Sequence, residues 1–556
     1  MLLPPWKPAA STARGLSAGW PNGISDVLVV GGGITGAGVA LDAASRGLRT
    51  ALVERDDFAS GTSSKSSKMV HGGLRYLEQG DFRLVYEALR ERQRLRRNAP
   101  HLVTTLPFLI PLFKKSGMIN HRIARALGLA MWIYDLTGGY RIGKLHRRLS
   151  RDQAVAHMPV LHRERIAGAY LYYDARADDA RLTLAVVRTA ALDHGAVVAN
   201  RTSLVGLDKD ATGRTTRARL RADGQEFFVR ARVVVNAAGV WSDDVRGLDE
   251  TPRPDSIRPA KGIHIVVPWS KLRNDIAVSV PGAGGKRSIC AVPWGDYSFV
   301  GTTDTDYDGP LDDPQCTPED VDYLLASLNA SITETVTRDD VLGTWAGLRP
   351  LLKQANTNRT VDLSRRHKVS VSGSGVLSIT GGKLTTYRQM AEDTVDEAVR
   401  RLEAPSRRRH RSRTRRLRLR GAEGFTDAQR YDRLPAETVT HLTNRYGGEA
   451  RVLFDLIQKQ PDLGEPLVPG LPYLRAEAIH GVRHEMATSL DDLLSRRTRA
   501  RLLARDASAA AAERVADLVA KELGWSKERQ QAEVASFRAA CELERQAAGL
   551  ARTPCP

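Results

Sequence analysis

A short apolar run, a glycine-rich turn and a helix-like stretch follow one another between residues 26 and 54. The run Asp26–Val30 is typical of a buried parallel strand, and glycines follow it in the order G-x-G-x-x-G. A stretch with helical periodicity comes next, and the apolar run Thr50–Val53 then ends in Glu54. This order of elements predicts a βαβ unit that binds a dinucleotide.

Each residue of this motif has a mechanical task. Gly31 permits the tight turn, Gly33 lets a pyrophosphate approach the backbone, and Gly36 lets the helix pack on the strand. The helix N-terminus presents N–H groups to the phosphates. Glu54 is placed to accept hydrogen bonds from the adenosine ribose, which suits FAD as well as NAD.

A segment dense in hydroxyls and glycines, residues 61–80, follows the ribose-binding acid directly. One interpretation is a flexible serine-rich linker. The other is a cofactor loop whose hydroxyls satisfy pyrophosphate and ribityl oxygens. We favour the cofactor loop, with contacts from Thr62, Ser63, Ser66 and Ser67.

The middle of the chain alternates helical and strand patterns. Residues 81–97 and 184–193 are expected to be helices, and 196–199, 227–230 and 233–235 to be strands. The last strand runs into a small-residue turn ending at Gly239, which is either an ordinary strand-to-helix turn or a surface for the cofactor. Residues 261–268 and 288–306 are rich in strand formers, the second as a hairpin turning at 293–296.

Residues 375–399 repeat the logic of the first motif. An apolar strand precedes Gly381–Gly382 and a helix whose Met390, Val395 and Val399 face inward, so a second helix N-terminus is directed at the cofactor. We expect an α/β fold in which the Rossmann-like dinucleotide-binding domain is discontinuous (24–100, 180–245 and 340–400). A β-rich substrate domain is then expected to occupy 101–179 and 246–339.

The two ends differ from the middle. Residues 1–23 are expected to form a disordered leader, and 401–420 an exposed basic linker, since 406–420 holds nine arginines and no acid. Residues 421–556 are rich in Ala, Leu, Arg and Glu and predict an all-α C-terminal domain.

Composition narrows the class of protein. With 556 residues, 42% of them hydrophobic, the chain predicts two or three globular domains. Its four cysteines form no CxxC pair, which supports neither a zinc site nor a disulfide framework and favours a reducing cytoplasm. The formal net charge of +19 attracts nucleic acid, acidic headgroups or an anionic substrate.

One helical stretch and one basic run suggest macromolecular partners. In residues 121–134 an apolar stripe (Ile123, Leu127, Met131, Tyr134) predicts either an interfacial membrane helix, aided by Trp132 and the five basic residues of 141–148, or a buried amphipathic helix. The arginine run favours a solvated linker over nonspecific nucleic-acid binding, so no specific nucleic acid is expected.

Five blocks in order, HGGLRYLEQGDFRLVYEAL, KGIHIVVP, GTTDTD, GLRPLL and TGGKLTTYRQMAEDTVD, carry a resemblance to a known family. The chain resembles the FAD-dependent glycerol-3-phosphate dehydrogenases, well over residues 25–400 and more loosely beyond. The resemblance implies FAD, a D-amino-acid-oxidase-like substrate domain, and oxidation of sn-glycerol 3-phosphate to dihydroxyacetone phosphate. It also implies electron transfer to a membrane quinone, or to oxygen in an oxidase branch, and peripheral attachment to the cytoplasmic membrane.

The resemblance also assigns roles to residues. It implies that Arg75, Tyr76 and Arg365 contact the substrate, with the two arginines on its phosphate, and that His264, Arg349 and Lys383 surround C2 and its oxygen. Further cofactor contacts are expected from Gly72, Gly73 and Leu74 in the first block, from Gly382 and Thr385 in the last block, and from Val205 and Gly239 outside the blocks.

Several alternatives stay open on the residues alone. His264 is either the general base or a core histidine bonded to a backbone carbonyl, and Arg366 competes with Arg365 for the phosphate because the family's acidic and aromatic residues do not follow here. One rival function is a flavin oxidase of the same fold that passes electrons to oxygen or that oxidises an amino acid. Another is a noncatalytic protein that binds a membrane or nucleic acid on a degenerate flavin scaffold. The sequence leaves the oligomeric state open, a homodimer included.

Overall fold

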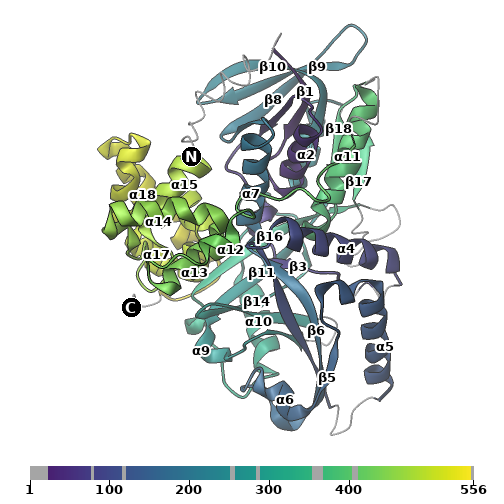
Figure 1. Cartoon of the computed structure of the whole chain (residues 1–556), viewed down its shortest axis with the longest axis vertical. Coiled ribbons are helices and arrows are strands. Elements are labelled where there is room, and N and C mark those ends of the chain that lie inside the picture. Colours follow the sequence, from purple (N-terminus) through teal and green to yellow (C-terminus); the bar gives the residue numbers. More distant parts are fainter. Residues whose placement is uncertain are drawn as a thin grey trace.

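The structure is a computed structural model that describes residues 23–74, 76, 80–114, 121–250, 257–283, 288–353, 367–402 and 411–552, without the side chains of 121–125. The expected leader therefore lies almost wholly outside the described residues. The chain forms two sheet domains and a separate all-helical domain that packs beside both (Figure 1). This confirms the predicted α/β class with an all-α C-terminal domain.

The first sheet is the core of the cofactor domain. Its main strands run in the order β17-β18-β10-β1-β2-β7, and the hairpin β8–β9 is attached to β10. β18, β10, β1, β2 and β7 are parallel to one another, so their carboxyl ends meet at one edge, whereas β17 is antiparallel to β18. The bounds are β1 Ile24–Val30, β2 Thr50–Val53, β7 Val197–Ala199, β8 Thr202–Lys209, β9 Thr215–Ala222, β10 Gln225–Asn236, β17 Lys368–Val371 and β18 Leu377–Thr380.

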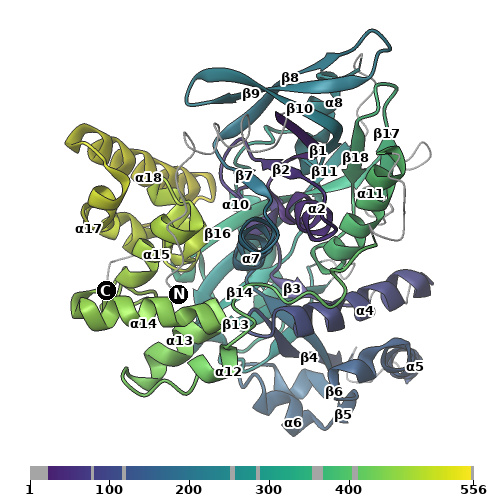
Figure 2. The ribbon, with the colours of Figure 1, turned by 45° about the horizontal axis from the view of Figure 1, so that its top comes forward.

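Three helices pack their apolar sides on this sheet. α2 (Ile34–Ser45) lies between α7 (Asp179–Leu192) and α11 (Tyr387–Arg401), and all three contribute to one buried cluster with β1, β10 and β18. The inward positions predicted for Met390, Val395 and Val399 are confirmed, since each is at most 5% exposed. Figure 2 shows α2 and α7 side by side on this face.

The second sheet has ten strands, most of them antiparallel, in the order β15-β11-β14-β13-β12-β4-β6-β3, with β16 on β11 and β5 on β6. The predicted hairpin is confirmed, because β13 and β14 join through residues 295–296. The bounds are β3 Met69–Val70, β4 Val103–Phe113, β5 Arg147–Leu149, β6 Ile166–Ala177, β11 Ile257–Pro268, β12 Ala277–Pro281, β13 Ser288–Trp294, β14 Tyr297–Gly301, β15 Thr305–Asp306 and β16 Gly343–Leu352.

One domain boundary differs from the expectation. β16 lies in residues assigned to the cofactor domain, yet it pairs along its whole length with β11 of the second sheet. Long antiparallel pairing satisfies its backbone N–H and C=O groups there. The chain re-enters the cofactor domain only after β16, at β17 and β18.

Helices cover the rest of the molecule. α4 (Phe82–Asn98) runs beneath the cofactor domain, and α5 (His121–Thr137), α6 (Arg151–Ala156), α9 (Trp269–Leu272) and α10 (Pro318–Asn329) surround the second sheet (Figure 1). A short helix, α8 (Ser242–Gly247), follows β10. The C-terminal domain comprises α12 Phe425–Ala428, α13 Ala436–Tyr446, α14 Ala450–Lys459, α15 Arg475–Glu485, α16 Ala500–Leu503, α17 Arg505–Leu523 and α18 Lys527–Ala547.

The basic segment before this domain is not wholly exposed. Residues 403–410 lie outside the described part of the chain, but Leu419 is buried and Ser412 donates to Asp42 of α2 at 2.6 Å. Arg415 and Arg420 pair with Glu392 and Glu449, respectively. The expectation of an exposed linker therefore holds for part of 411–420, where Arg411, Arg413, Arg416 and Arg418 are exposed, and it is wrong for Thr414 and Leu419, which are buried.

Candidate active site

The carboxyl ends of the parallel strands frame a groove of about 340 Å³. β1 ends before Gly31, β2 before Glu54, β10 before Ala237 and β18 before Gly381, and all four positions line the groove. Ligands of open α/β sheets bind at this edge. The structure thus brings together the two glycine motifs and the small-residue turn, which are far apart in the sequence.

The first turn is shaped for close backbone contact. Gly31 has φ +109°, and a Cβ added to it would lie 2.6 Å from the carbonyl oxygen of Ala237. A Cβ on Gly36 would lie 1.9 Å from the carbonyl oxygen of Gly31, so the helix packs on the turn only without a side chain there. Gly33 is the N-cap of α2 and lines the groove. These positions fit the tasks that the motif predicts.

Glu54 lies at the end of β2 with both carboxylate oxygens engaged by the backbone. Oε2 accepts from the Gly32 amide at 2.6 Å and Oε1 from the Asp56 amide at 2.9 Å. Burial raises the pKa of Glu54, and these two amide hydrogen bonds partly offset that effect. Each oxygen retains a second lone pair, so the carboxylate can still receive a ribose hydroxyl.

We call residues 57–68 the cofactor loop. Hydrogen bonds to neighbouring elements fix this segment, so the alternative of a flexible linker is wrong. Thr62 donates to the Leu348 carbonyl at 2.6 Å, and Ser63 Oγ accepts from the Ile34 amide at 2.9 Å. Both residues line the groove. Ser66 instead donates to Asp179 at 2.7 Å, and Ser67 Oγ lies 2.9 Å from His264 Nε2.

The groove also contains residues that the sequence did not single out. Trp241, after the turn at Gly239, lines it with Asp244 and Leu248, and its Nε1 is buried with no hydrogen-bond partner among the described residues. A buried donor of this kind is normally satisfied, so it fits an acceptor on a bound dinucleotide. Thr202, Ser203 and Leu204 line the groove, whereas Val205, the residue expected there, does not.

A second cluster lies where the loop after β3 meets the start of the second glycine motif. Lys383 Nζ lies 3.6 Å from the ring centroid of Tyr76, and Thr385 Oγ1 accepts from the His71 amide at 3.1 Å. Gly73 has φ +78°, and a Cβ on it would lie 2.3 Å from the Tyr76 ring. Gly382 and Lys383 also line the groove, which places this cluster beside the cofactor position.

This cluster rests on a buried polar network that the sequence analysis missed. The Gly72 amide donates to Tyr134 Oη at 3.1 Å and to Asp174 at 3.2 Å, Tyr134 donates to Asp174 at 2.7 Å, and Arg92 pairs with the same carboxylate. Leu74 packs beside this network. Asp174 in the mostly apolar strand β6 was the available signal, because a buried carboxylate needs partners.

His264 lies on β11 between Ile263 and Ile265, and those two residues enter a core on the opposite face of the sheet. Its ring stacks on Trp345 with centroids 4.7 Å apart. It bonds the Ser67 hydroxyl rather than a backbone carbonyl. Burial, followed by the positive charges of Lys68 and Arg349, lowers the pKa of His264 well below its usual value, so the imidazole is neutral at pH 7.

Arg349 is on β16, opposite Ala260 of β11. Its guanidinium pairs with Asp304 at 3.1 Å and donates to Thr302 Oγ1 at 3.2 Å and to the Thr303 carbonyl at 3.1 Å. It therefore anchors the GTTDTD segment to β16. The predicted phosphate contacts Arg75 and Arg365, and the competitor Arg366, lie outside the described residues.

Comparisons with known proteins identify the family. The FAD dependent oxidoreductase family matches residues 26–388, and the C-terminal domain of alpha-glycerophosphate oxidase matches residues 412–530. The chain is 41% identical over 530 residues to a glycerol-3-phosphate dehydrogenase of Mycobacterium leprae, covering 93% of this chain and 88% of that one. It is 38% identical to the mitochondrial enzyme of Mus musculus, covering 92% and 72% of the two chains.

A solved structure agrees with these sequence matches. The glycerol-3-phosphate dehydrogenase from Bacillus halodurans, complexed with FAD, superimposes with a TM-score of 0.77 at 31% identity and covers 96% of this chain and 98% of that one. The glycine cradle, the helix N-terminus and Glu54 fit the same cofactor. This chain therefore belongs to the family of FAD-dependent glycerol-3-phosphate dehydrogenases.

Proposed function

We propose that this protein oxidises sn-glycerol 3-phosphate to dihydroxyacetone phosphate and passes the electrons to a membrane quinone. The observation that supports this choice of substrate is the sequence similarity along most of the chain. Relatives named glycerol-3-phosphate dehydrogenase match more than nine tenths of it, through both the sheet domains and the helical domain. Bound FAD supplies the acceptor for the hydride that leaves C2 of the substrate.

The side chains around the cofactor position suit this substrate. A phosphate dianion needs cations, and Lys383 brings one to the edge of the groove, stacked over Tyr76. We assign the phosphate itself to Arg75 and Arg365, because guanidinium forks bind phosphate bidentately.

His264 is the proposed general base. When the C–H bond at C2 gives its hydride, the hydroxyl on C2 must lose its proton, and a neutral imidazole can take it. The lowered pKa of His264 keeps that imidazole neutral at pH 7. Its Nδ1 is buried and has no hydrogen-bond partner among the described residues, while Nε2 contacts Ser67 in the cofactor loop. Arg349, which lowers that pKa, is proposed to orient the oxygen on C2.

The test is an anaerobic absorbance spectrum of the purified protein before and after adding sn-glycerol 3-phosphate. Bleaching of the oxidised flavin band by this compound, and not by sn-glycerol 1-phosphate or glycine, is the expected result. A flavin spectrum that glycine bleaches would support the amino-acid oxidase alternative. A flavin that none of the three reduces would contradict the proposed substrate.

An exposed apolar face supports attachment to a membrane surface. On α5 the predicted apolar stripe is buried at Met131 and Tyr134, so these two residues pack as the alternative of a buried amphipathic helix predicts. The opposite side of the helix exposes Leu129, Trp132 and Leu136 by 64%, 53% and 75%, at a spacing that places them on one face. The segment that follows α5 returns to this face, because the His146 ring contacts Trp132 with centroids 4.9 Å apart. In that segment Tyr140, Leu145, Lys144, Arg147 and Arg148 are exposed.

An apolar face bordered by cations fits the cytoplasmic side of a bilayer with anionic lipid, where a quinone dissolves. No helix in the described part of the chain is long and apolar enough to cross a membrane. We therefore propose peripheral attachment through the α5 face. Leu129, Trp132 and Leu136 are all more than half exposed, so substitutions on this face should cost the fold little, and we choose Trp132 and Leu136 for the test.

Vesicle sedimentation tests this attachment. The double variant Trp132→Ser/Leu136→Ser should lose most of its binding to vesicles that contain phosphatidylglycerol, whereas Leu543→Ser, which removes a 51% exposed leucine from α18, should bind like the parent. Equal binding of the parent and the double variant would reject the α5 face.

A second experiment tests the electron acceptor. If the reduced flavin is reoxidised by quinone in these vesicles and no hydrogen peroxide forms, the protein is a dehydrogenase and not an oxidase.

A further inference from the structure

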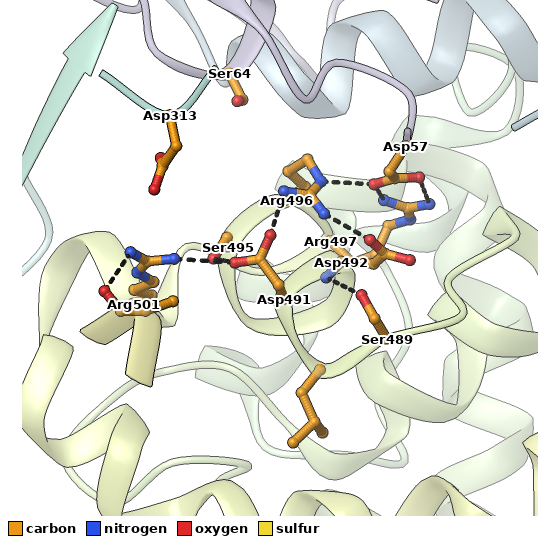
Figure 3. A network of polar contacts seen from close by, with 12 residues as sticks. Asp57, Ser64, Asp313, Ser489, Asp491, Asp492, Ser495, Arg496, Arg497 and Arg501 are labelled. Atoms are coloured by element: carbon orange, nitrogen blue, oxygen red, sulfur yellow. Dashed lines mark hydrogen bonds and ion pairs between the residues drawn. The ribbon is translucent and has the colours of Figure 1, made fainter. Parts of the chain in front are cut away.

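The helical domain reaches into the cofactor domain through an aspartate that follows the ribose-binding acid. Asp57 begins the cofactor loop and is fully buried. Arg497 binds it with both ends of its guanidinium, Nη1 to Oδ2 at 2.6 Å and Nη2 to Oδ1 at 2.8 Å. Arg496 adds a third contact, Nε to Oδ2 at 2.6 Å (Figure 3). Two guanidiniums of one domain therefore hold one carboxylate of another.

The far end of the cofactor loop is held from the same stretch of the helical domain. Arg499 pairs with Asp178 at 2.6 Å and with Asp179, and it donates to the Ser64 carbonyl at 3.4 Å. Asp179 in turn accepts from the Ser66 amide at 3.0 Å and the Ser66 hydroxyl at 2.7 Å. Lys68 joins this group through Asp179 at 3.1 Å and the Ser64 carbonyl at 3.1 Å.

Two of these three arginines, Arg496 and Arg497, lie in an unusual local backbone, and Arg499 follows it. Asp492–Arg497 forms a π-helical turn, a rare conformation that is frequent at functional sites. Asp492 accepts from Arg496 at 2.5 Å within this turn, which fixes the guanidinium toward Asp57 (Figure 3). Arg497 and Arg499 are 0% and 1% exposed, so neither has water as an alternative partner.

The charges of the two arginines keep the buried carboxyl group of Asp57 ionised. Burial by itself would raise the pKa of Asp57, but Arg497 and Arg496 lower it below its usual value, so Asp57 stays ionised without solvent. A buried ion pair adds little stability over an apolar contact of the same volume, whereas removing one partner leaves an uncompensated charge. Such a pair therefore serves best to fix one geometry.

The position of the cofactor loop determines two contacts, one at the cofactor groove and one with His264. Between the two held ends, Ser63 accepts from the Ile34 amide at the N-terminus of α2 and lines the cofactor groove. Ser67 contacts His264. A shift of the loop would move both.

We propose that Arg496, Arg497 and Arg499 of the helical domain are positioning residues that hold the cofactor loop in its FAD-binding geometry. The helical domain thus takes part in retaining the flavin. The inference concerns FAD and not the proposed substrate, so its test reads flavin release from the holoenzyme and needs no turnover.

The test compares Asp57→Asn and Arg499→Gln with a matched control. Glu449→Gln also removes an ion pair between the helical domain and the cofactor domain, that of Arg188 with Glu449 at 2.5 Å, but Glu449 does not contact the cofactor loop. After dilution, the rise of free-flavin fluorescence gives the release rate. We expect release at least tenfold faster in Asp57→Asn and Arg499→Gln, and within twofold of the parent in Glu449→Gln.

Two results would overturn the proposal. One is release from both loop variants within twofold of the parent, and the other is equally accelerated release from Glu449→Gln, which would indicate a general loss of stability. If Asp57→Asn does not fold, Arg497→Lys keeps the charge but loses the bidentate contact. It should release FAD several-fold faster at an unchanged melting temperature, and an unchanged rate would likewise reject the role of Arg497.

Discussion

Replacing His264 with asparagine separates a catalytic histidine from a core histidine. The side chain is 2% exposed, stacks on Trp345 at 4.7 Å and bonds Ser67 at 2.9 Å. Asparagine is smaller, keeps a polar end that can reach the Ser67 hydroxyl, and cannot accept a proton. The substitution therefore removes the base and part of the stacking while it retains a hydrogen-bonding side chain.

The two roles predict effects of different size on different quantities. A positioned general base contributes about 10²- to 10⁴-fold in rate, which corresponds to about 3–5 kcal/mol of barrier. Loss of an aromatic contact of this kind costs about 1 kcal/mol, and a weakened hydrogen bond about 1 kcal/mol more. We expect flavin reduction to slow by at least 100-fold and the free energy of unfolding to fall by about 1–2 kcal/mol.

Anaerobic stopped-flow reduction by sn-glycerol 3-phosphate measures the first quantity, and urea unfolding the second. In the parent, the pKa of His264 lies well below its usual value, so the reduction rate should stay level as pH falls from 8 to 6.5 and decline only at lower pH, where the imidazole takes up a proton. A variant that reduces its flavin within threefold of the parent rate while losing stability would refute the catalytic role. A parent rate that halves between pH 7 and 6.5 would refute the neutral imidazole.

Three further substitutions test separate parts of the structure. Lys383→Met should lower kcat/KM for sn-glycerol 3-phosphate by about 10- to 100-fold at unchanged flavin content, because a charge-assisted contact is worth about 1.5–3 kcal/mol; steady-state kinetics checks this. Gly36→Ala should yield protein without a flavin absorbance band, since its Cβ would lie 1.9 Å from the Gly31 carbonyl oxygen. Glu449→Gln should lower the free energy of unfolding at pH 7 by up to about 3 kcal/mol, because Glu449 has its pKa lowered from 4.5 to about 2. That stabilisation is present above pH 4.5 and lost toward pH 2, so urea unfolding should show the parent and variant converging as pH falls.

The proposed membrane attachment depends on a feature that the sequence pattern left undecided. The stripe of α5 could be assigned to one face from its periodicity, yet both faces of the helix carry large apolar side chains. Packing against the second sheet buries Met131 and Tyr134, and it leaves Trp132 exposed. Periodicity identifies which residues share a face, whereas only the neighbouring elements decide which face meets the core.

The sequence by itself determined the cofactor half of this protein. Glycines 31, 33 and 36 and Glu54 lie within one βαβ unit, so their spacing alone specifies the turn, the helix N-terminus and the acid at the end of the second strand. The hairpin at 293–296 and the helix after Gly382 were predictable for the same reason, since turn chemistry and helical periodicity are local. The family resemblance, carried by short contiguous blocks, depended on nothing more distant.

Only the tertiary structure decided which distant charges meet. Arg497 binds Asp57 across 440 positions of sequence, and Arg499 binds Asp179 across 320. No periodicity links such partners, and an arginine-rich chain offers many candidates for each carboxylate. Burial selects among them, because a carboxylate removed from water stays ionised only where the fold brings a cation to it.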